Sequence, residues 1–552
     1  MKKTFLLSCL MLAAMPVMAA YTGHVYVDKN KNGVFDQSEK PLAGIKVSDG
    51  LNVVETAADG SFTLPGHERE RFIFITTPSG YKTFNRHYHK IEKKQSGYDF
   101  GLIPYSGRIR KNGSHRYIHI ADTEIFNTEN HADWVNNVRD YARNEQAAFI
   151  IHTGDICYEK GLKAHIKLMN TENMDCPVFY CIGNHDLVKG KYGEELFESI
   201  YGPVYYSFDA GNVHYVVTPM PGGDHAPGYT SDDVCRWLKN DLAHIRPGTP
   251  VVVFNHDLLT YEDTFIFKSK NAGSINLNEY NLKAWVYGHW HINYMKKQGD
   301  VYSVCTSSLD KGGIDHSTTA FRVMHVDSKG DFTSELRYTY LDKNICIASP
   351  AGVMASGVLP VAVNVYSSVS PVREVLYTCL ADGKPVLKNK RLLQSTDWSW
   401  NGELPLSHKY VGKELTLRVT ARFNNGEIAE AESNFICRTE KAVPLFSADW
   451  DNLSGNAKHS APVSAPLNLP LQLAWTNNVG ANLYMTSPLI HKGKVIVASV
   501  DEDLKGAGHV YALNGKDGTI LWSCPVRNSI KNSIAVDSDI VFAQDAQGFL
   551  YA

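Results

Sequence analysis

The sequence predicts a multidomain protein in which an α/β domain lies between all-β sandwich domains and is followed by incomplete β-propeller blades at the C-terminus. With 552 residues, the chain is longer than one hydrophobic core normally organises. Strand-like and helix-like segments alternate from about residue 115 to residue 325, which is typical of an α/β sheet. Short alternating strands, separated by Gly, Asp and Pro, fill the segments on either side and indicate β domains.

Residues 1–20 are predicted to be a signal peptide. Two lysines precede the apolar run "TFLLSCLMLAAMPVMAA", which ends in small residues spaced for cleavage near Ala19 or Ala20. We therefore expect export to the periplasm, the cell surface or the extracellular space. No later run is long enough to span a bilayer, and a formal charge of −3 gives no basic footprint, so we expect neither a membrane span nor a stable nucleic-acid partner.

Residues 21–106 are predicted to form an N-terminal β-sandwich, because runs such as "GHVYVD" and "RFIFITTPSGY" are short and rich in β-formers. Its first turn, "DKNKNGVFDQSE", has the spacing of a calcium loop, in which oxygen ligands alternate around a glycine. The candidate calcium ligands are Asp28, Asn30, Asn32, Asp36 and Glu39. The alternative is a metal-free turn, since Asp and Asn also favour solvated turns.

Residues 107–344 are predicted to form the α/β domain. "RYIHIADTE" and "AAFIIHTGDI" are typical of buried strands, and the segment between them carries Trp134, Val138 and Tyr141 at helical spacing. Further strands, among them "PVFYCIGNHD" and "PVVVFNHDLL", continue the alternation. We expect one sheet covered on both faces, and such sheets bind ligands beyond the carboxyl ends of their strands.

The C-terminal part of the chain returns to β patterns. Residues 345–440 contain alternating strands joined by "DG" and "NNG" turns, which favours an immunoglobulin-like sandwich. Residues 441–470, rich in Pro, Ala, Ser and Asn, are predicted to be a linker. Residues 471–552 repeat a phrase similar to the blade of quinoprotein-type β-propellers, as in "GHVYALNGKDGTILW", and are predicted to form partial propeller repeats.

Polar side chains follow five predicted strands of the α/β domain. In chain order they are Asp122, Glu124, Asp155, Asn184, His185, Asp186, His256, Asp257, His289 and His291. One strand-end Asp would normally cap a turn, and one buried His would normally be a hydrogen-bonded core residue. Five such strand ends at one sheet edge would repel one another unless cations neutralise them. The pattern therefore predicts a metal centre.

These strand ends carry the blocks "ADTE", "TGDI", "GNHD", "FNHD" and "GHWH" in that order. The order resembles the calcineurin-like metallophosphoesterase family, whose motifs run Asp-x-His, Gly-Asp, Gly-Asn-His-(Asp/Glu), a later His and Gly-His-x-His. The resemblance covers residues 115 to 325 and points to a secreted multidomain member. It implies an α/β sandwich fold for this domain. It also implies a metal-dependent phosphoric ester hydrolase that acts on a small phosphoester: a phosphodiester, a nucleotide or a phosphomonoester.

The resemblance also implies a role for each matching residue. Asp155 would bridge two divalent ions of manganese, iron or zinc, the first completed by Asp122, Glu124 and His291, and the second by Asn184, His256 and His289. Such ions lower the pKa of a bridging water, and the resulting hydroxide attacks phosphorus in line. His185 would face the phosphate and protonate the leaving oxygen, and Asp186 would hold His185 or a neighbouring loop.

Glu124 is the one departure from the family pattern, which usually has histidine there. A carboxylate can ligate directly or through water, and it would shift preference toward harder cations. An alternative function remains: a catalytically inactive protein that binds surfaces through its β modules. Against it stand the intact residues Asn184, His185, His256, His289 and His291.

Overall fold

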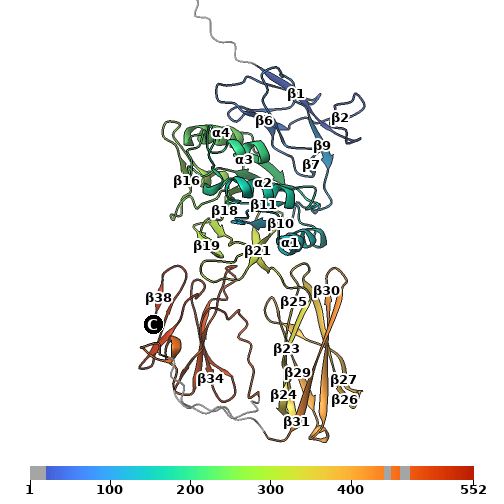
Figure 1. The fold of residues 1–552 in the computed structure, drawn as a ribbon, viewed down its shortest axis with the longest axis vertical. Helices are drawn as coiled ribbons and strands as arrows, with labels where there is room; N and C mark the ends of the chain where they lie inside the picture. The colour runs from blue at the N-terminus through green and yellow to red at the C-terminus, as the bar shows by residue number, and fades with distance from the viewer. Residues whose placement is uncertain (1–19, 441–448, 461–472) are drawn as a thin grey trace, which may run out of the picture.

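The computed structural model describes residues 20–440, 449–460 and 473–552 (Figure 1). The predicted signal peptide, apart from residue 20, and most of the predicted linker lie outside the described residues. Within the described part of the chain, none of the helices combines the length and the apolar composition needed to cross a membrane. In the view of Figure 1 the N-terminal β domain lies above the α/β domain, and two β modules lie side by side below it.

The N-terminal domain consists of two small sheets that share one core. The first contains β1 (Tyr21–Val27), β2 (Lys40–Pro41), β5 (Ser61–Leu64), β7 (Tyr81–Thr83) and β9 (Phe100–Pro104). The second contains β3 (Lys46–Ser48), β4 (Val53–Glu55), β6 (Phe72–Ile75) and β8 (Tyr88–Lys90). Val25 and Phe100 from the first sheet pack with Val47 and Ile73 from the second. Their burial joins the two sheets into one domain.

The α/β domain contains two sheets where the sequence predicted one. The first has the order β12 (Val178–Tyr180), β11 (Ile150–His152), β10 (His115–Ile120), β21 (Ala320–Val326) and β22 (Phe332–Tyr338). The second has the order β13 (Tyr206–Ala210), β14 (Val213–Val217), β15 (Val251–Phe254), β18 (Leu282–Tyr287), β20 (Val301–Cys305) and β19 (Tyr294–Gln298). A separate hairpin is formed by β16 (Ile266–Lys268) and β17 (Ser274–Asn276).

The two sheets face each other across an aromatic core. The ring of Phe149, which precedes β11, lies 4.9 Å from that of Tyr215 on β14 and 6.4 Å from that of Phe254 on β15, measured between centroids. The single sheet expected from the alternation of strands and helices is therefore wrong, whereas the sandwich implied by the family resemblance agrees with the two facing sheets. Fully apolar strands are buried on both faces in either arrangement, so their periodicity does not indicate which sheet they join.

Helices cover the outer faces of this sandwich. They are α1 (Ala132–Asn144), α2 (Tyr158–Leu168), α3 (Glu195–Tyr201) and α4 (Ser231–Ala243), with 3-10 turns η1 (Asn184–Asp186) and η2 (Leu277–Tyr280). The apolar stripe of α1 buries Trp134 and Val138 beside Ile118 of the first sheet. That of α4 buries Trp237 beside Val251 of the second. The predicted helical spacing in 132–144 is therefore confirmed.

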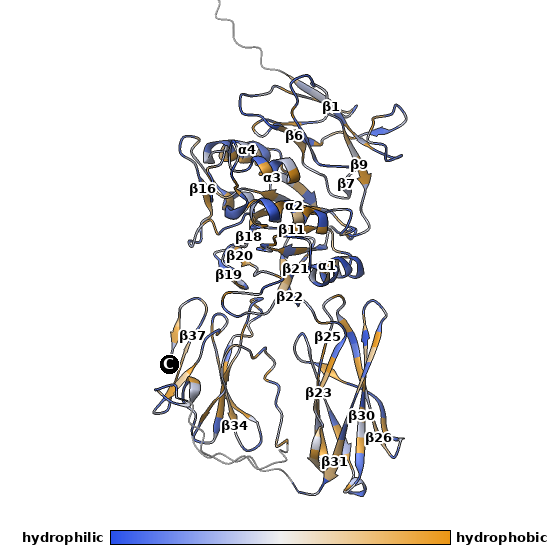
Figure 2. Ribbon diagram, viewed as in Figure 1, coloured by the Kyte–Doolittle hydropathy of each residue, from blue (hydrophilic) through white to orange (hydrophobic). Residues whose placement is uncertain are grey.

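The region 344–438 forms two sheets around a second core. One contains β23 (Asn344–Ser349), β25 (Gly357–Tyr366), β28 (Leu393–Gln394) and β29 (Ser399–Leu406). The other contains β24 (Gly352–Ala355), β26 (Val372–Ala381), β27 (Lys384–Arg391), β30 (Glu414–Phe423) and β31 (Ile428–Arg438), and η3 (His408–Tyr410) lies between β29 and β30. Buried residues alternate with exposed or half-buried ones along β30. Figure 2 shows hydrophobic and hydrophilic residues mixed along the strands of this module. The immunoglobulin-like assignment itself stays a prediction.

The C-terminal module has a four-stranded antiparallel sheet and a three-stranded one. They contain β32 (Leu489–His491), β33 (Lys494–Ala498), β34 (His509–Asn514) and β35 (Ile520–Pro525), then β36 (Ala535–Asp537), β37 (Ile540–Gln544) and β38 (Leu550–Tyr551), preceded by η4 (Leu453–Gly455). The propeller assignment stays a prediction. The module contacts the α/β domain through Asp503, whose carboxylate lies 2.6 Å from the guanidinium of Arg322, and through Lys531, which donates to the carbonyl of Asn293.

Candidate metal centre

The predicted ligands lie where strands of both sheets end. Asp122, Asp155 and Asn184 follow β10, β11 and β12 of the first sheet. His256 follows β15 of the second sheet, and His289 follows β18. Because parallel strands of each sheet end on the same side, the facing sheets bring these five side chains to one edge of the sandwich.

Strained backbone is concentrated at the ligand positions. Five of the seven predicted metal ligands have positive φ, namely Asp122 (51°), Glu124 (44°), Asp155 (55°), His289 (64°) and His291 (51°). A left-handed conformation costs a non-glycine residue on the order of 1–2 kcal/mol. Strain retained at this many neighbouring positions is typical of a functional site, where it aims side chains at a common point.

Glycines next to the ligands leave room for this close approach. Gly154 has a φ of 94°, and a Cβ there would lie 2.7 Å from Nδ1 of His256. A Cβ at Gly288 would lie 2.7 Å from Oδ2 of Asp122. Any larger residue at Gly154 or Gly288 would therefore displace a ligand.

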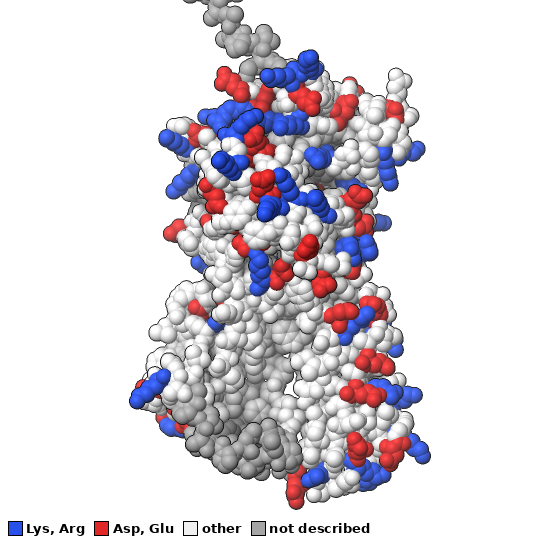
Figure 3. Space-filling view, in the orientation of Figure 1, with Lys and Arg blue, Asp and Glu red and all other residues white. Residues whose placement is uncertain are grey.

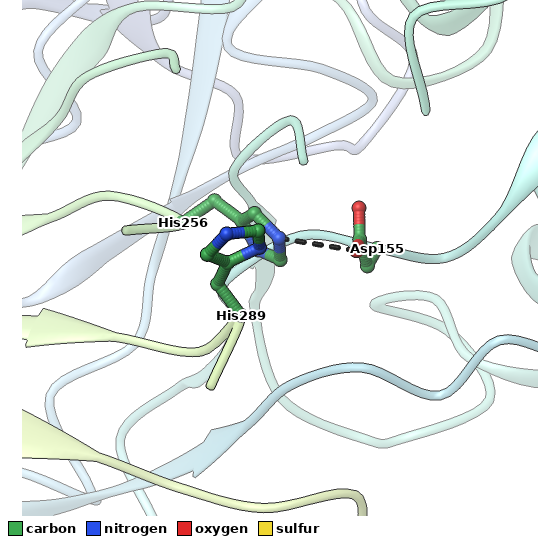
Figure 4. Close-up of side chains that lie close together, drawn as sticks. All are labelled: Asp155, His256 and His289. Atoms are coloured by element: carbon green, nitrogen blue, oxygen red, sulfur yellow. Dashed lines mark ion pairs between the residues drawn. The ribbon is translucent and has the colours of Figure 1, made fainter. Parts of the chain in front are cut away.

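Besides a group with Glu124 and Cys157, Asp155 belongs to two groups of ligand atoms that correspond to the two predicted metal positions. In one group its carboxylate lies with His256 and His289, all ligand atoms within 4.8 Å of one another (Figure 4). In the other it lies with Asp122 and His291 at the same limit. This sharing is what the bridging role predicted for Asp155 requires, and oxygen with imidazole ligands suits two divalent cations of manganese, iron or zinc.

Individual distances agree with this division. Nε2 of His256 lies 3.2 Å from Oδ2 of Asp155 and 3.1 Å from Oδ1 of Asn184. Nε2 of His291 lies 3.5 Å from Oδ1 of Asp122. Asn184 therefore lies beside His256, and Asp122 lies beside His291 and 4.0 Å from Nε2 of His256. The assignment of each residue to one cation stays a prediction.

The site is buried and rich in negative charge. Burial raises the pKa of Asp122 well above its usual value, despite the nearby imidazole of His256. Burial would lower the pKa of His256, but the carboxylates of Asp155 and Asp122 outweigh it and raise the pKa to about 9. Carboxylates held together in this way are costly unless a cation neutralises them, so the residues fit a metal centre.

Hydrogen bonds fix the orientation of the ligands from behind. The carbonyl of Thr153 accepts a hydrogen bond from Nδ1 of His256 at 2.7 Å, which leaves Nε2 facing Asp155. The hydroxyl of Thr153 lies 2.8 Å from Nε2 of His119, and Nδ1 of His119 lies 2.8 Å from the hydroxyl of Thr306. His119 is thus a supporting residue and not a ligand.

His185 lies at the mouth of the site. Its backbone N–H donates to Oδ1 of Asp155 at 3.0 Å, and its Nδ1 lies 2.8 Å from Oδ2 of Asp224. Asp186 is fully buried below it and accepts from the backbone N–H groups of Cys157 at 2.8 Å and Gly183 at 2.9 Å. Asp186 therefore holds the loops that carry the ligands, and Asp224 is the carboxylate that holds His185.

Glu124 lies between an imidazole and an ammonium group. Its Oε1 is 3.6 Å from Nε2 of His291, and its Oε2 is 2.8 Å from Nζ of Lys311, which also donates to the Glu124 carbonyl at 3.1 Å. Glu124 therefore adjoins the group that contains Asp122 and His291. Sequence reasoning missed Lys311 and Asp224, because neither adjoins a strand end that carries a ligand.

The candidate calcium loop is closed by its own hydrogen bonds. Asp28 accepts from the backbone N–H groups of Asn32 at 3.1 Å and Gly33 at 3.0 Å. Glu39 accepts from the N–H of Asp36 at 3.2 Å, and the amide of Asn30 donates to Asp36 at 2.7 Å. These bonds satisfy the side chains as a metal-free turn would, and calcium binding stays a prediction.

Comparisons with known proteins agree with the site. Residues 115–293 match the family model described as calcineurin-like phosphoesterase, and residues 29–104 match the model of the N-terminal domain of calcineurin-like phosphoesterase. Purple acid phosphatase 13 of Arabidopsis thaliana is 26% identical over 215 residues, which cover 36% of this chain and 36% of that protein. The chain thus spans about a third of the length of this curated relative.

Two solved structures are also similar in part. A predicted phosphoesterase from Streptococcus pneumoniae TIGR4 is 10% identical, with 41% of this chain and 98% of that chain covered and a TM-score of 0.20. CopC from Methylosinus trichosporium OB3b is 13% identical, with 18% and 100% covered and a TM-score of 0.15. Residues 29–104 and 115–293 therefore match the N-terminal domain and the phosphoesterase domain of the calcineurin-like phosphoesterase family.

Proposed function

We propose that the protein is an exported, metal-dependent phosphoesterase that uses two divalent cations to hydrolyse a small phosphoester. The observation that carries the proposal is the position of Asp155, which belongs to both groups of ligand atoms. The family matches and the similarity to a purple acid phosphatase support the same reaction. Export rests on the N-terminal segment of the sequence, and its test is the location of the protein after cell fractionation.

The residues that would hold the cations also define where the phosphate binds. One cation would lie among Asp122, Asp155 and His291 with Glu124 beside it, and the other among Asp155, Asn184, His256 and His289. When bound, two such ions supply positive charge to the phosphoryl oxygens and activate the attacking water. The protein holds their ligands rigidly through Thr153, Asp186 and the strained turns, so little reorganisation is needed during reaction.

His185 is placed to serve the leaving group. Asp224 binds its Nδ1, so its Nε2 remains available to the substrate. As the bond from water oxygen to phosphorus forms and the bond to the leaving oxygen breaks, His185 donates a proton to that oxygen. Asp224 holds the ring in position and stabilises its cationic form before transfer.

Lys311 offsets the additional charge of Glu124. A carboxylate in place of the usual histidine adds one negative charge to the first metal position, and the ammonium of Lys311 lies 2.8 Å from it. The position stays rich in hard oxygen ligands, which favours manganese or iron over zinc there.

The test is hydrolysis by the purified protein of p-nitrophenyl phosphate and bis-p-nitrophenyl phosphate, with manganese, iron, zinc or magnesium supplied and the metal content measured. We expect turnover with manganese or iron, and His185→Ala is expected to lose turnover while it retains metal. His408→Ala, an exposed histidine next to Ser356 in the second β domain, is the matched control. No hydrolysis on a broad phosphoester panel with any of these metals would reject the enzyme in favour of a binding protein.

A further inference from the structure

Large apolar side chains are exposed around the metal centre. Phe126 is 56% exposed two residues after Glu124, and Tyr158 is 43% exposed three residues after Asp155. Ile314 is 75% exposed, and its backbone N–H donates to the carbonyl of His291. Single exposed apolar residues are ordinary, but a group of them around a reaction centre indicates a surface that binds apolar matter.

Two of these side chains continue the ring of His185 outward. The ring of Tyr158 lies 5.2 Å from that of His185, and its hydroxyl lies 3.4 Å from Nδ1 of His185. The ring of Phe126 lies 6.3 Å from that of Tyr158, and the two planes differ by only 16°. The three rings form a row that begins at the proton donor and ends in solvent.

The backbone is strained where Tyr158 enters this row. Tyr158 has a φ of 54°, and Cys157 before it has a φ of 77°. Both are left-handed conformations that cost free energy at residues other than glycine. Tyr158 is the first residue of α2, and its aromatic ring is exposed to solvent there. A polar side chain at this position would have no apolar surface to expose. Strain that exposes a ring is consistent with a role in binding.

The outer part of the row of rings, Tyr158 and Phe126, carries no charge, unlike the acidic metal centre. Figure 3 shows Lys and Arg interspersed with Asp and Glu over the face of the molecule that it draws. Beside the row, the carboxylate of Asp224 is paired with His185. Lys311 is occupied by Glu124, so the row itself presents two uncharged rings. The complementary partner is a flat, uncharged ring, which stacks on aromatic faces through dispersion and quadrupole forces.

We infer that Phe126 and Tyr158 form a stacking platform for a planar aromatic ring carried by the leaving group of the substrate. The inference rests on the proposed phosphoesterase function and names its substrate class: phosphoesters of alcohols that bear an aromatic ring, such as a nucleoside or an aryl alcohol. The platform adjoins His185, which protonates the leaving oxygen, so the ring belongs to the alcohol that departs and not to the phosphate that remains.

The test uses pairs of substrates that differ only in the ring. Benzyl phosphate is compared with cyclohexylmethyl phosphate, and adenosine 5′-monophosphate with ribose 5-phosphate, because each pair releases a similar primary alcohol. Stacking of a base on an aromatic side chain strengthens binding by roughly 5- to 150-fold. We expect kcat/KM of the manganese-loaded protein to favour the aromatic member of each pair by at least about tenfold, mainly through KM.

Substitutions of Phe126 test whether the preference for aromatic substrates comes from the platform. Phe126→Ala and Phe126→Leu are expected to bring the ratio within each pair toward one, and both alter a side chain that is more than half exposed. Phe549→Ala removes an exposed ring of the C-terminal module, 41% exposed, and should leave the ratios as they are. A ratio near one in the wild-type protein, or a ratio that both Phe126 variants leave unchanged, would overturn the platform. Preference for the nucleotide pair alone would identify a nucleoside as the ring carrier.

A binding measurement separates the platform from the proposed function. Benzylphosphonate and cyclohexylmethylphosphonate are not hydrolysed, so their calorimetric affinities for the metal-loaded protein do not depend on turnover. Tighter binding of benzylphosphonate that Phe126→Ala abolishes would support the platform even if no phosphoester were hydrolysed. Equal affinities alongside active hydrolysis would reject the platform and leave the phosphoesterase proposal intact.

Discussion

The contact between Arg322 and Asp503 gives the sharpest prediction about how the domains hold together. Arg322 lies on β21 of the phosphoesterase domain, and its side chain is 0% exposed. Asp503 comes from the C-terminal module, 2.6 Å away, and also lies 3.3 Å from Lys505. The change Asp503→Asn keeps the size of the side chain and removes its charge. It leaves the guanidinium buried without its counter-ion.

The expected cost follows from this burial. Removal of one partner of a buried ion pair costs roughly 3–5 kcal/mol, because the remaining charge stays desolvated. Since each 1.4 kcal/mol is a factor of ten, the undocked population of the module should rise between about 100-fold and a few thousand-fold. Native-state hydrogen exchange of the peptides that cover β21 and residues 501–507 reports this population directly.

A surface ion pair with the same separation between its charged atoms provides the control. Arg418 and Glu432 also lie 2.6 Å apart, but their side chains are 47% and 49% exposed. Exposed pairs contribute about 0–1 kcal/mol, so Glu432→Gln should change exchange of its own strands less than about fivefold. If Asp503→Asn accelerates exchange no more than Glu432→Gln does, burial of the Arg322 charge does not control docking and the reasoning is wrong.

Three further predictions concern the metal centre and stability. Gly154→Ala should lose metal, measured by mass spectrometry, because its Cβ would lie 2.7 Å from His256, whereas Gly248→Ala, at a φ of 82° with open space around it, should keep metal. Glu124→His should keep phosphoesterase activity and raise the zinc-to-manganese ratio of bound metal; an unchanged ratio would show that Glu124 does not ligate. Burial would raise the pKa of Glu335, but hydrogen bonds from His325 and Arg337 outweigh it and lower the pKa to about 2. The ionised Glu335 therefore stabilises the fold fully above its unfolded pKa near 4.5, and this part is lost as pH falls toward 2. Glu335→Gln should accordingly lower the denaturant midpoint at pH 7 more than at pH 3; equal losses at both would contradict this.

The candidate ligands could be proposed from the sequence because they lie next to recognisable strand ends. A buried strand, a glycine and a polar residue occur together at Asp155, at Asn184 and at His289. Because the strands within each sheet are parallel there, their carboxyl ends lie at the same edge of the sheet. The chemistry of the ligands then follows from residue type alone. No knowledge of which sheet a strand joins is needed for this step.

The supporting residues could not be predicted because they depend on how distant segments pack. Asp224 and Lys311 come from loops, and their positions are set by the two facing sheets. The division into two sheets is itself invisible in runs that are apolar on both faces. One signal was present: Arg322 interrupts the apolar run "AFRVMHV", and a buried arginine requires a partner from elsewhere in the chain.

Arg322 also connects the docked module to the metal centre. It pairs across the sheet with His119, and its Nε donates to the hydroxyl of Thr306 at 3.1 Å. The same hydroxyl lies 2.8 Å from Nδ1 of His119, and Nε2 of His119 lies 2.8 Å from the hydroxyl of Thr153. The carbonyl of Thr153 in turn orients His256. Buried hydrogen bonds on either side of Thr153 therefore connect Arg322 with His256, a candidate metal ligand.

Thr306 tests whether this set positions the ligand or only fills space. Thr306→Val keeps the shape of the side chain and removes the hydroxyl, whereas Thr306→Ser keeps the hydroxyl. Loss of outer hydrogen bonds behind a ligating histidine typically weakens metal binding about 10- to 100-fold, so we expect that loss in the valine variant and recovery in the serine variant. Metal affinity is measured by competition with a chelator, and the melting temperature serves as the control for folding. Wild-type affinity in Thr306→Val would show that the backbone of Thr153 holds His256 without help from the residues behind it.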